Sequence, residues 1–332
     1  MIIYGPVPSR RLGRSLGINN IPSKICTYSC IYCQAGRTTH LQAARRAFFT
    51  PEAIVAAVAE RLETLRERGE KVDYLSFVPN GEPTLDENLG RTIELLQPLG
   101  IRIAVITNAS LLWRADVREE LAKADWVSVK VDTVHEDLWR KLDRPHPSLS
   151  LADVLAGIRT FAELFQGGLE AETMLVRGVN DAEEDLQQSG NFIALLKPAR
   201  ACLSAPVRPP AEPFVELPQE DSLNRGFQIY REHGIPVELL VDYEGTSFSS
   251  TGDAGEDLLA ITAVHPMRED AVAEYLARGN RDWCMIRDLI DQGRLVETAY
   301  RGSRFYVSRL CVRKCPVDPL PYAESSCPEK EG

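Results

Sequence analysis

The chain alternates short runs of apolar, β-branched residues with segments in which apolar residues recur every three or four positions. Runs of the first kind predict buried strands, and segments of the second kind predict amphipathic helices. Strands are expected at 15–21, 73–79, 101–108, 126–132, 169–178 and 199–207, with a further edge strand at 236–241. Helices are expected at 50–69, 85–100, 150–165 and 181–197. Six strands separated by helices predict repeated βα units and a parallel sheet, hence an α/β fold.

The expected helix at 50–69 shows how these boundaries are set. Thr50 is a good N-cap, Pro51 suits the first helical position, and Gly69 suits the end.

A right-handed series of six βα units can form an open, partial (β/α)6 TIM-type barrel. In such a barrel, the chemistry lies at the carboxyl ends of the strands and in the loops that follow them.

The pattern changes after residue 242. Residues 243–254 are rich in Gly, Ser and Thr and predict a linker. Three helix patterns follow, and then two alternating runs flank a Gly-Ser turn, as in a hairpin. This order is typical of a winged helix. We therefore expect a barrel at 1–242, a linker at 243–254, a small winged-helix-like domain at 255–310, and a Cys/Pro-rich tail at 311–332.

The composition narrows the class of protein. Of 332 residues, 44% are hydrophobic and 26% charged, as in globular proteins, and no apolar run is long enough to span a bilayer. The basic start of a secretory signal is missing, so we expect a cytoplasmic location and mostly reduced cysteines. The net charge of -10 argues against a protein whose whole surface binds nucleic acid.

Three of the eight cysteines, Cys26, Cys30 and Cys33, lie within eight residues in a C-x3-C-x2-C pattern. A structural zinc site would need a fourth ligand, for which His40 is the nearest candidate. A thioredoxin-type pair would use Cys30 and Cys33 and leave Cys26 over. A four-iron cluster fits the count better, because three cysteines leave one iron open to another ligand.

This spacing, with Tyr32 just before the last cysteine, resembles the signature of the radical S-adenosylmethionine (SAM) superfamily. The resemblance covers roughly residues 10–240 and implies a [4Fe-4S] cluster on the three cysteines, with SAM as the second cofactor. Other positions resemble the family's SAM-binding positions. Together with Tyr32, the implied cofactor-binding residues are Asn80, Gly81, Glu82, Asn108, Ser110, Asp132 and Met174, with Glu172 as a further candidate.

Some of these positions have simpler interpretations. Asn80 stands where the family motif has a glycine, and Asn80-Gly81 could form a plain turn. Asn108, Ser110 and Asp132 follow strands, where polar residues commonly cap loops. These alternatives remain open at the level of the sequence.

The resemblance also implies an activity. The reduced cluster would cleave SAM to a 5′-deoxyadenosyl radical, which would abstract hydrogen from an unidentified substrate. Such an oxidoreductase-like enzyme needs an external electron donor such as flavodoxin or ferredoxin. Several segments resemble a mostly unassigned subgroup related to wyosine synthase, a tRNA-modifying enzyme. No membrane partner is expected.

Two charged residues near strand ends have two interpretations each. Lys130 could form a Schiff base with a carbonyl substrate, but a lysine paired with Asp132 or another carboxylate is the simpler interpretation. Arg208 could meet an anionic substrate group or be a surface ion-pair partner.

The tail carries Cys311, Cys315 and Cys327, which suggest an auxiliary iron-sulfur cluster. A zinc site and unligated cysteines are the alternatives for the tail. Cys202 and Cys284 suit packed apolar positions.

Two alternative functions remain. One is an RNA modifier whose basic face would include Arg10, Arg11 and Arg14. The other is a non-catalytic iron-sulfur regulator whose winged helix binds DNA. Acidic residues in the expected winged helix favour a docking or structural role over nucleic-acid binding.

Overall fold

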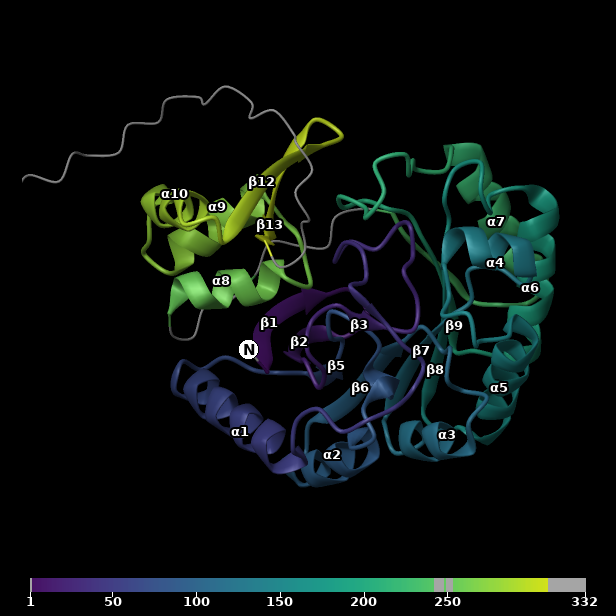
Figure 1. The fold of residues 1–332 in the computed structure, drawn as a ribbon, viewed down its shortest axis with the longest axis horizontal. Coiled ribbons are helices and arrows are strands. Elements are labelled where there is room, and N and C mark those ends of the chain that lie inside the picture. Colours follow the sequence, from purple (N-terminus) through teal and green to yellow (C-terminus); the bar gives the residue numbers. More distant parts are fainter. Residues whose placement is uncertain (1, 242–247, 249–252, 310–332) are drawn as a thin grey trace, which may run out of the picture.

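The computed structural model describes residues 2–241, 248 and 253–309. One sheet contains eight strands in the order β1-β2-β5-β6-β7-β8-β9-β10, and helices surround it in Figure 1. The strands are β1 (Ile3–Ser9), β2 (Gly13–Ile18), β5 (Tyr74–Phe77), β6 (Arg102–Thr107), β7 (Trp126–Lys130), β8 (Gly168–Met174), β9 (Arg200–Ser204) and β10 (Val237–Leu240). All pair in parallel except β1, which is antiparallel to β2.

The mostly parallel α/β sheet with its extra edge strand confirms the sequence prediction. The unexpected strand is β1, whose two prolines, Pro6 and Pro8, weaken a strand pattern. Its place at the end of the strand order explains why prolines are tolerated, since an edge strand needs fewer ladder hydrogen bonds.

Within residues 2–241, seven α-helices accompany the sheet. They are α1 (Pro51–Glu67), α2 (Leu89–Leu96), α3 (Ala115–Leu121), α4 (Glu136–Leu142), α5 (Leu151–Leu164), α6 (Glu183–Leu196) and α7 (Glu220–Glu232), with short 3-10 turns η1 (Pro83–Leu85) and η2 (Gln97–Leu99). The four expected helices correspond to α1, α2, α5 and α6. The sequence pattern missed α3 and α4 because seven residues give barely two turns of periodicity, and it missed α7, which is largely polar.

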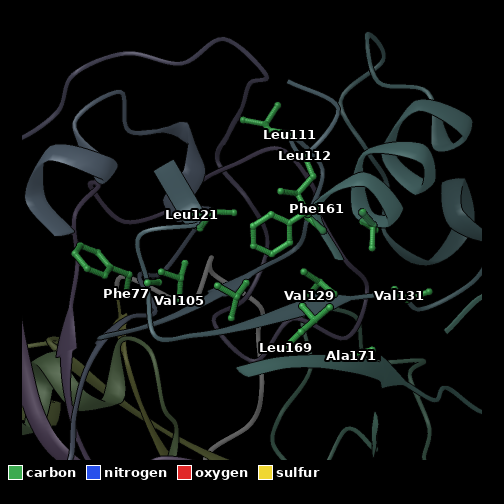
Figure 2. Close-up of a cluster of buried hydrophobic side chains, with 14 of the residues drawn as sticks. Phe77, Val105, Leu111, Leu112, Leu121, Val129, Val131, Phe161, Leu169 and Ala171 are labelled. Atoms are coloured by element: carbon green, nitrogen blue, oxygen red, sulfur yellow. The ribbon is translucent and has the colours of Figure 1, made fainter. Parts of the chain in front are cut away.

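The face of the sheet toward the helices is apolar. Phe77, Val105, Val129 and Ala171 lie on this face and belong to one buried hydrophobic cluster with Phe161 of α5 (Figure 2). Since successive side chains of a strand point to opposite faces, this alternation leaves the other face free for different residues.

The opposite, inner face of the sheet carries polar groups. The Ser15 and Ser76 hydroxyls lie 2.6 Å apart across two strands, and Ser128 and Glu172 lie on the neighbouring strands β7 and β8. Burial of such groups is costly unless each has a hydrogen-bond or ionic partner. The inner face is therefore where the fold holds polar groups by interactions within the protein.

A second set of elements follows the sheet: α8 (Ala254–Thr262), β11 (Met267–Arg268), α9 (Glu269–Arg278), α10 (Trp283–Asp291), β12 (Leu295–Tyr300) and β13 (Ser303–Ser308). The three strands pair antiparallel in the order β11-β13-β12, and the elements share a hydrophobic core of their own. We call residues 253–309 the C-terminal module. Its helix α8 lies along β1 (Figure 1), and Arg61 pairs with Asp257 at 2.9 Å.

The domain boundaries proposed from the sequence stay a prediction. The cysteines Cys311, Cys315 and Cys327 lie outside the described residues. In the described ranges, no helix is both long and apolar enough to cross a bilayer.

Gly157 in α5 provides a test of the close contact between this helix and the loop after β6. A Cβ at this position would lie 2.3 Å from the Trp113 nitrogen and 2.4 Å from the Leu112 carbonyl carbon. Inside an exposed helix, a Gly→Ala substitution raises the free energy of unfolding by about 1 kcal/mol. Here the clash is with backbone, so we expect Gly157→Ala to lower the free energy of unfolding by about 1–3 kcal/mol in urea titrations.

Gly226→Ala in α7 is the matched control. Its Cβ would meet only the methyl groups of Leu186 and Leu203, at 3.3 Å, and side chains can move by that little. We expect a change within about 1 kcal/mol. Equal stability of Gly157→Ala and the unmodified protein would contradict the close backbone contact.

Candidate active site

The cysteine loop follows β2 at the carboxyl end of the sheet. Its short strand β3 (Ile25–Cys26) pairs with β4 (His40–Leu41), and Ile25 also bridges to Gly81 in the loop after β5. A Cβ on Gly81 would lie 2.0 Å from the Ile25 carbonyl oxygen, so only glycine allows this approach. The loop that carries the cysteines and the loop that carries Glu82 are thus in backbone contact.

Glu82 connects three loops through its backbone and its buried carboxylate. Its backbone N–H donates to the Ile25 carbonyl at 3.1 Å. One carboxylate oxygen accepts from the Thr107 hydroxyl at 2.6 Å, and the other accepts from the Asn108 N–H at 2.8 Å. Burial raises the pKa of Glu82, and these donors oppose the shift.

Asn108 connects the Glu82 carboxylate to the cysteine loop. Its side-chain amide donates to the Thr27 hydroxyl at 2.7 Å and lies 3.6 Å from the Cys26 sulfur. The fully buried Ser110 donates to the same Thr27 hydroxyl at 2.7 Å. The ends of β5 and β6 therefore fix the position of the first cysteine.

The three cysteines Cys26, Cys30 and Cys33 are free and partly buried. Burial, followed by the nearby Glu82 charge, raises the pKa of Cys26 to about 12, and Cys33 adds to the shift. Burial, Asp143 and the other two cysteines raise the pKa of Cys30 well above its usual value. The three sulfurs therefore lie close enough to influence one another electrostatically, and a metal centre would displace their protons.

The three thiols match the ligand count of an iron-sulfur cluster with one open iron, whereas a structural zinc ion takes four ligands. A tetrahedral zinc ion would hold its sulfur ligands roughly 3.8 Å apart, from a Zn–S length of about 2.3 Å. A four-iron cluster takes one thiolate per iron and needs wider spacing. His40, the zinc alternative's fourth ligand, is exposed on β4.

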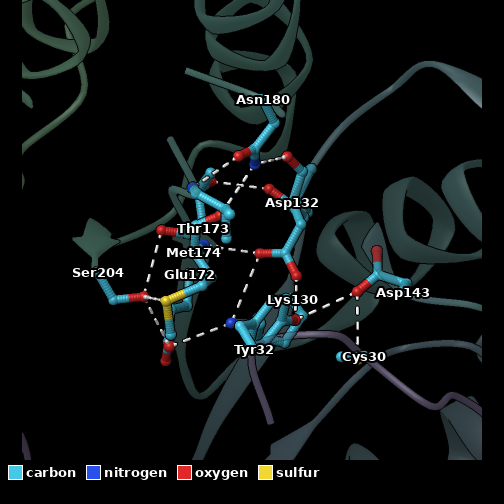
Figure 3. A network of polar contacts seen from close by, with 12 residues as sticks. Cys30, Tyr32, Lys130, Asp132, Asp143, Glu172, Thr173, Met174, Asn180 and Ser204 are labelled. Carbon is cyan, nitrogen blue, oxygen red and sulfur yellow. Dashed lines mark hydrogen bonds and ion pairs between the residues drawn. The ribbon is translucent and has the colours of Figure 1, made fainter. Parts of the chain in front are cut away.

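A buried polar network lies beside Cys30 (Figure 3). The Cys30 thiol donates to an Asp143 oxygen at 3.3 Å, and the Tyr32 hydroxyl reaches the same oxygen at 3.2 Å and also donates to Asp132. Asp132 in turn accepts from the Met174 N–H at 2.7 Å. Burial and the Asp132 charge raise the pKa of Asp143 well above its usual value.

Lys130 joins this network to charges on the inner face of the sheet. Its ammonium lies 3.5 Å from Asp132 and 3.3 Å from Glu172, and Arg11 pairs with Glu172 at 2.9 Å. Burial lowers the pKa of Lys130, but the two carboxylates outweigh it and raise the pKa above the usual value. Ion pairing of Lys130, the simpler interpretation from the sequence, is confirmed.

One further interpretation from the sequence needs correction. Arg11 does not belong to an outer basic face: it reaches from the β1–β2 turn to Glu172 and to the Ser128 hydroxyl at 3.2 Å. Arg14 pairs with Glu70. Arg208 donates to Gln34 and His265, which are partners that the sequence did not suggest.

The segment after β9 covers the cysteine loop. The Glu212 N–H donates to the Ile31 carbonyl at 3.0 Å, and its carboxylate pairs with Arg37 at 2.5 Å and with Arg144. An apolar cluster beneath it includes Tyr32 and Val215. This cover reduces the access of water to the loop.

The structure places all predicted cofactor-binding residues at the carboxyl end of the sheet, in the loops after β2, β5, β6 and β7 and at the end of β8. Sequence reasoning missed Asp143, Thr27 and Thr107. The only signal for Asp143 was its position directly after the end of a helix. Thr27 and Thr107 gave none, because hydroxyl residues are common near strand ends.

A match to one protein-family model shows which family the chain belongs to. The model described as "Radical SAM superfamily" matches residues 20–189, which is more than half of the chain and includes the cysteine loop.

The chain belongs to the radical SAM superfamily. A UPF0026 protein of Methanocaldococcus jannaschii is 42% identical over 311 residues, which cover 93% of this chain and 96% of that protein. A radical SAM methyltransferase from Sphaerobacter thermophilus shares the fold, with a TM-score of 0.52, 21% identity, and coverage of 68% of this chain and 66% of the other. TYW1 with a lysine-pyruvate adduct bound has a TM-score of 0.50 and 18% identity, with coverage of 66% of this chain and 73% of the other.

Membership makes the protein a radical SAM enzyme, and radical SAM enzymes use a [4Fe-4S] cluster with SAM. Among the described residues, Cys26, Cys30 and Cys33 are free and lie in one loop beside Glu82 and Asn108, and thiols are the donors that such a cluster takes.

Glu172 allows a test of the charges inside this radical SAM fold. Burial opposes its charge, but Lys130 and Arg11 lower the pKa of Glu172 to about 2. A lowered pKa contributes stability above the usual pKa of about 4.5, and this stability is lost as the pH falls toward 2. Glu172→Gln should lose about 3 kcal/mol of unfolding free energy at pH 7, and the difference should shrink below pH 4.5.

Glu216→Gln is the control, because its pair with Arg177 is exposed. We expect a change of at most about 0.5 kcal/mol at any pH. Urea titrations from pH 7 to pH 3 measure both variants. A Glu172→Gln deficit that does not change with pH would show that its charge is not what stabilises the fold.

Proposed function

We propose that this radical SAM enzyme binds a [4Fe-4S] cluster through Cys26, Cys30 and Cys33 and cleaves SAM reductively. The observation that carries the proposal is the convergence of three free cysteines in one loop at the carboxyl end of the sheet. Three protein ligands leave one iron open for SAM. The substrate that then loses a hydrogen atom is unidentified.

When bound, the cluster and SAM supply the electron transfer and the 5′-deoxyadenosyl radical that starts the reaction. The chain supplies binding and orientation. We assign the cofactor contacts to the loops around the cysteines: Tyr32, Asn80, Gly81, Glu82, Asn108, Ser110, Asp132 and Met174.

The roles of the assigned residues differ. Gly81 allows the close backbone approach to the cysteine loop, and Glu82 and Asn108 hold Cys26. Asp132 has a carboxylate at the carboxyl end of β7, which is held by Lys130 and by the Met174 N–H. We assign Lys130 to hold this carboxylate rather than to attack a carbonyl group, since its protonated ammonium is no nucleophile.

Two architectural proposals accompany this function. The curved sheet with α1 to α7 is the partial (β/α)6 barrel, extended by β1 and β10. The C-terminal module is a winged helix, supported by the element order α8-β11-α9-α10-β12-β13. An external donor such as flavodoxin or ferredoxin would supply the electron.

The RNA-modifier alternative has less support. Arg11 and Arg14, two of its three basic residues, are engaged in ion pairs within the protein. Asp288 and Asp291 in α10 would also repel phosphates in a groove. The same charges disfavour a DNA-binding regulator, and the family is one of enzymes.

The test is anaerobic reconstitution with iron and sulfide, reduction with dithionite, and measurement of 5′-deoxyadenosine after addition of SAM. We expect about four irons for the cluster on the three cysteines. We also expect the unmodified protein to form 5′-deoxyadenosine. Cys26→Ala, Cys30→Ala and Cys33→Ala should each lower product at least about a hundredfold, because each removes one of three thiolate ligands.

Cys202→Ala is the matched control. Cys202 is also free and buried, but it lies on β9 within the sheet. We expect its iron content and product to stay within about twofold of the unmodified protein. An intact cluster on the three cysteines that never yields 5′-deoxyadenosine would refute the proposed activity.

A further inference from the structure

The end of helix α8 is held by side chains from the sheet domain. The last carbonyls of a helix have no partner within the helix and must find one elsewhere. The Asn80 amide donates to the Ala263 carbonyl at 2.9 Å, and the Gln34 amide donates to the Val264 carbonyl at 3.1 Å. The barrel thus supplies the C-terminal cap of a helix in the C-terminal module.

The two capping residues belong to the two loops that the proposed function uses. Gln34 directly follows Cys33, and Asn80 directly precedes Gly81. Asn80 is 4% exposed, and its backbone carbonyl accepts from the Lys24 N–H at 2.7 Å. Asn80 is therefore fixed on both sides: its backbone holds the start of the cysteine loop, and its side chain reaches the module.

A third loop completes the junction. Arg208, after β9, donates to the Gln34 side-chain oxygen at 3.0 Å and to Nε2 of His265 at 3.0 Å. Burial and the Arg208 charge lower the pKa of His265 well below its usual value, so its ring is neutral and can accept this bond. Tyr300 of β12 also donates to the Pro206 carbonyl, at 2.6 Å.

We propose that Asn80 and Gln34 are positioning residues: by capping α8 they fix the cysteine loop and the Gly81 turn against the C-terminal module. Residues Ala263–His265 are then a structural part of the cofactor site. This inference rests on the proposed function for its consequence, but the docking itself does not depend on it. Events that loosen the module would loosen both cofactor loops.

Hydrogen exchange on the full chain without cluster tests the docking. Asn80→Asp keeps the shape but replaces the donor with an oxygen facing the Ala263 carbonyl. Gln34→Glu removes the donor to Val264 and keeps an acceptor for Arg208. The loss of either donor to a buried carbonyl should speed amide exchange in a peptide covering 258–265 at least about fivefold in each variant.

Asn88→Asp is the matched control. The Asn88 amide donates to the Phe49 carbonyl at 3.2 Å, a bond of the same kind that stays within the sheet domain. Exchange at 258–265 should be unchanged in this variant. Unchanged exchange in both Asn80→Asp and Gln34→Glu would overturn the proposal, and if one variant fails to fold, the other decides.

The reconstituted enzyme tests the consequence. Asn80→Asp and Gln34→Glu should keep their iron content, while the KM for SAM rises about three- to tenfold through misplaced loops. A raised KM without faster exchange at 258–265 would mean that these side chains act only through contact with the cofactor and not through α8, and would overturn the positioning role. If the unmodified protein forms no 5′-deoxyadenosine, the exchange data still decide the docking, so the two failures are distinguishable.

Discussion

The site depends above all on the buried Glu82 carboxylate. It accepts hydrogen bonds from the end of β6, while the Glu82 backbone donates to the cysteine loop. A buried carboxylate is stable only when its oxygens accept hydrogen bonds, and here the donors belong to the loops that carry the site. One residue thus sets the relative position of β5, β6 and Cys26, and the parallel sheet brings these ends together because its carboxyl ends share one edge.

A second constraint is the charge held on the inner face of the sheet. Arg11, Lys130, Asp132 and Glu172 form a chain of ion pairs from the β1–β2 turn to the carboxyl end of β7. Each charge is costly to bury alone, so the chain is stable only as a set. It places a protonated lysine and a carboxylate next to Tyr32, in the layer beneath the cysteine loop.

Much of the fold could be predicted from the sequence. The six parallel strands and the edge strand at 236–241 were readable because each is a short apolar run bounded by turns. The cysteine loop was readable because its spacing is local. Strand β1 and the short helices α3 and α4 were not, since prolines and short length remove the periodic signal.

The sequence by itself determined the order of the parallel strands and the three thiols, because both depend on residues near one another in the chain. Only the tertiary structure decided the partners of Arg11, Asp143 and Asn80, which lie 161, 113 and 183 residues away in Glu172, Cys30 and Ala263. The neighbouring residues in the sequence do not indicate which distant donor or acceptor a side chain will contact in the folded protein. That choice depends on burial, which leaves a polar group no water as an alternative.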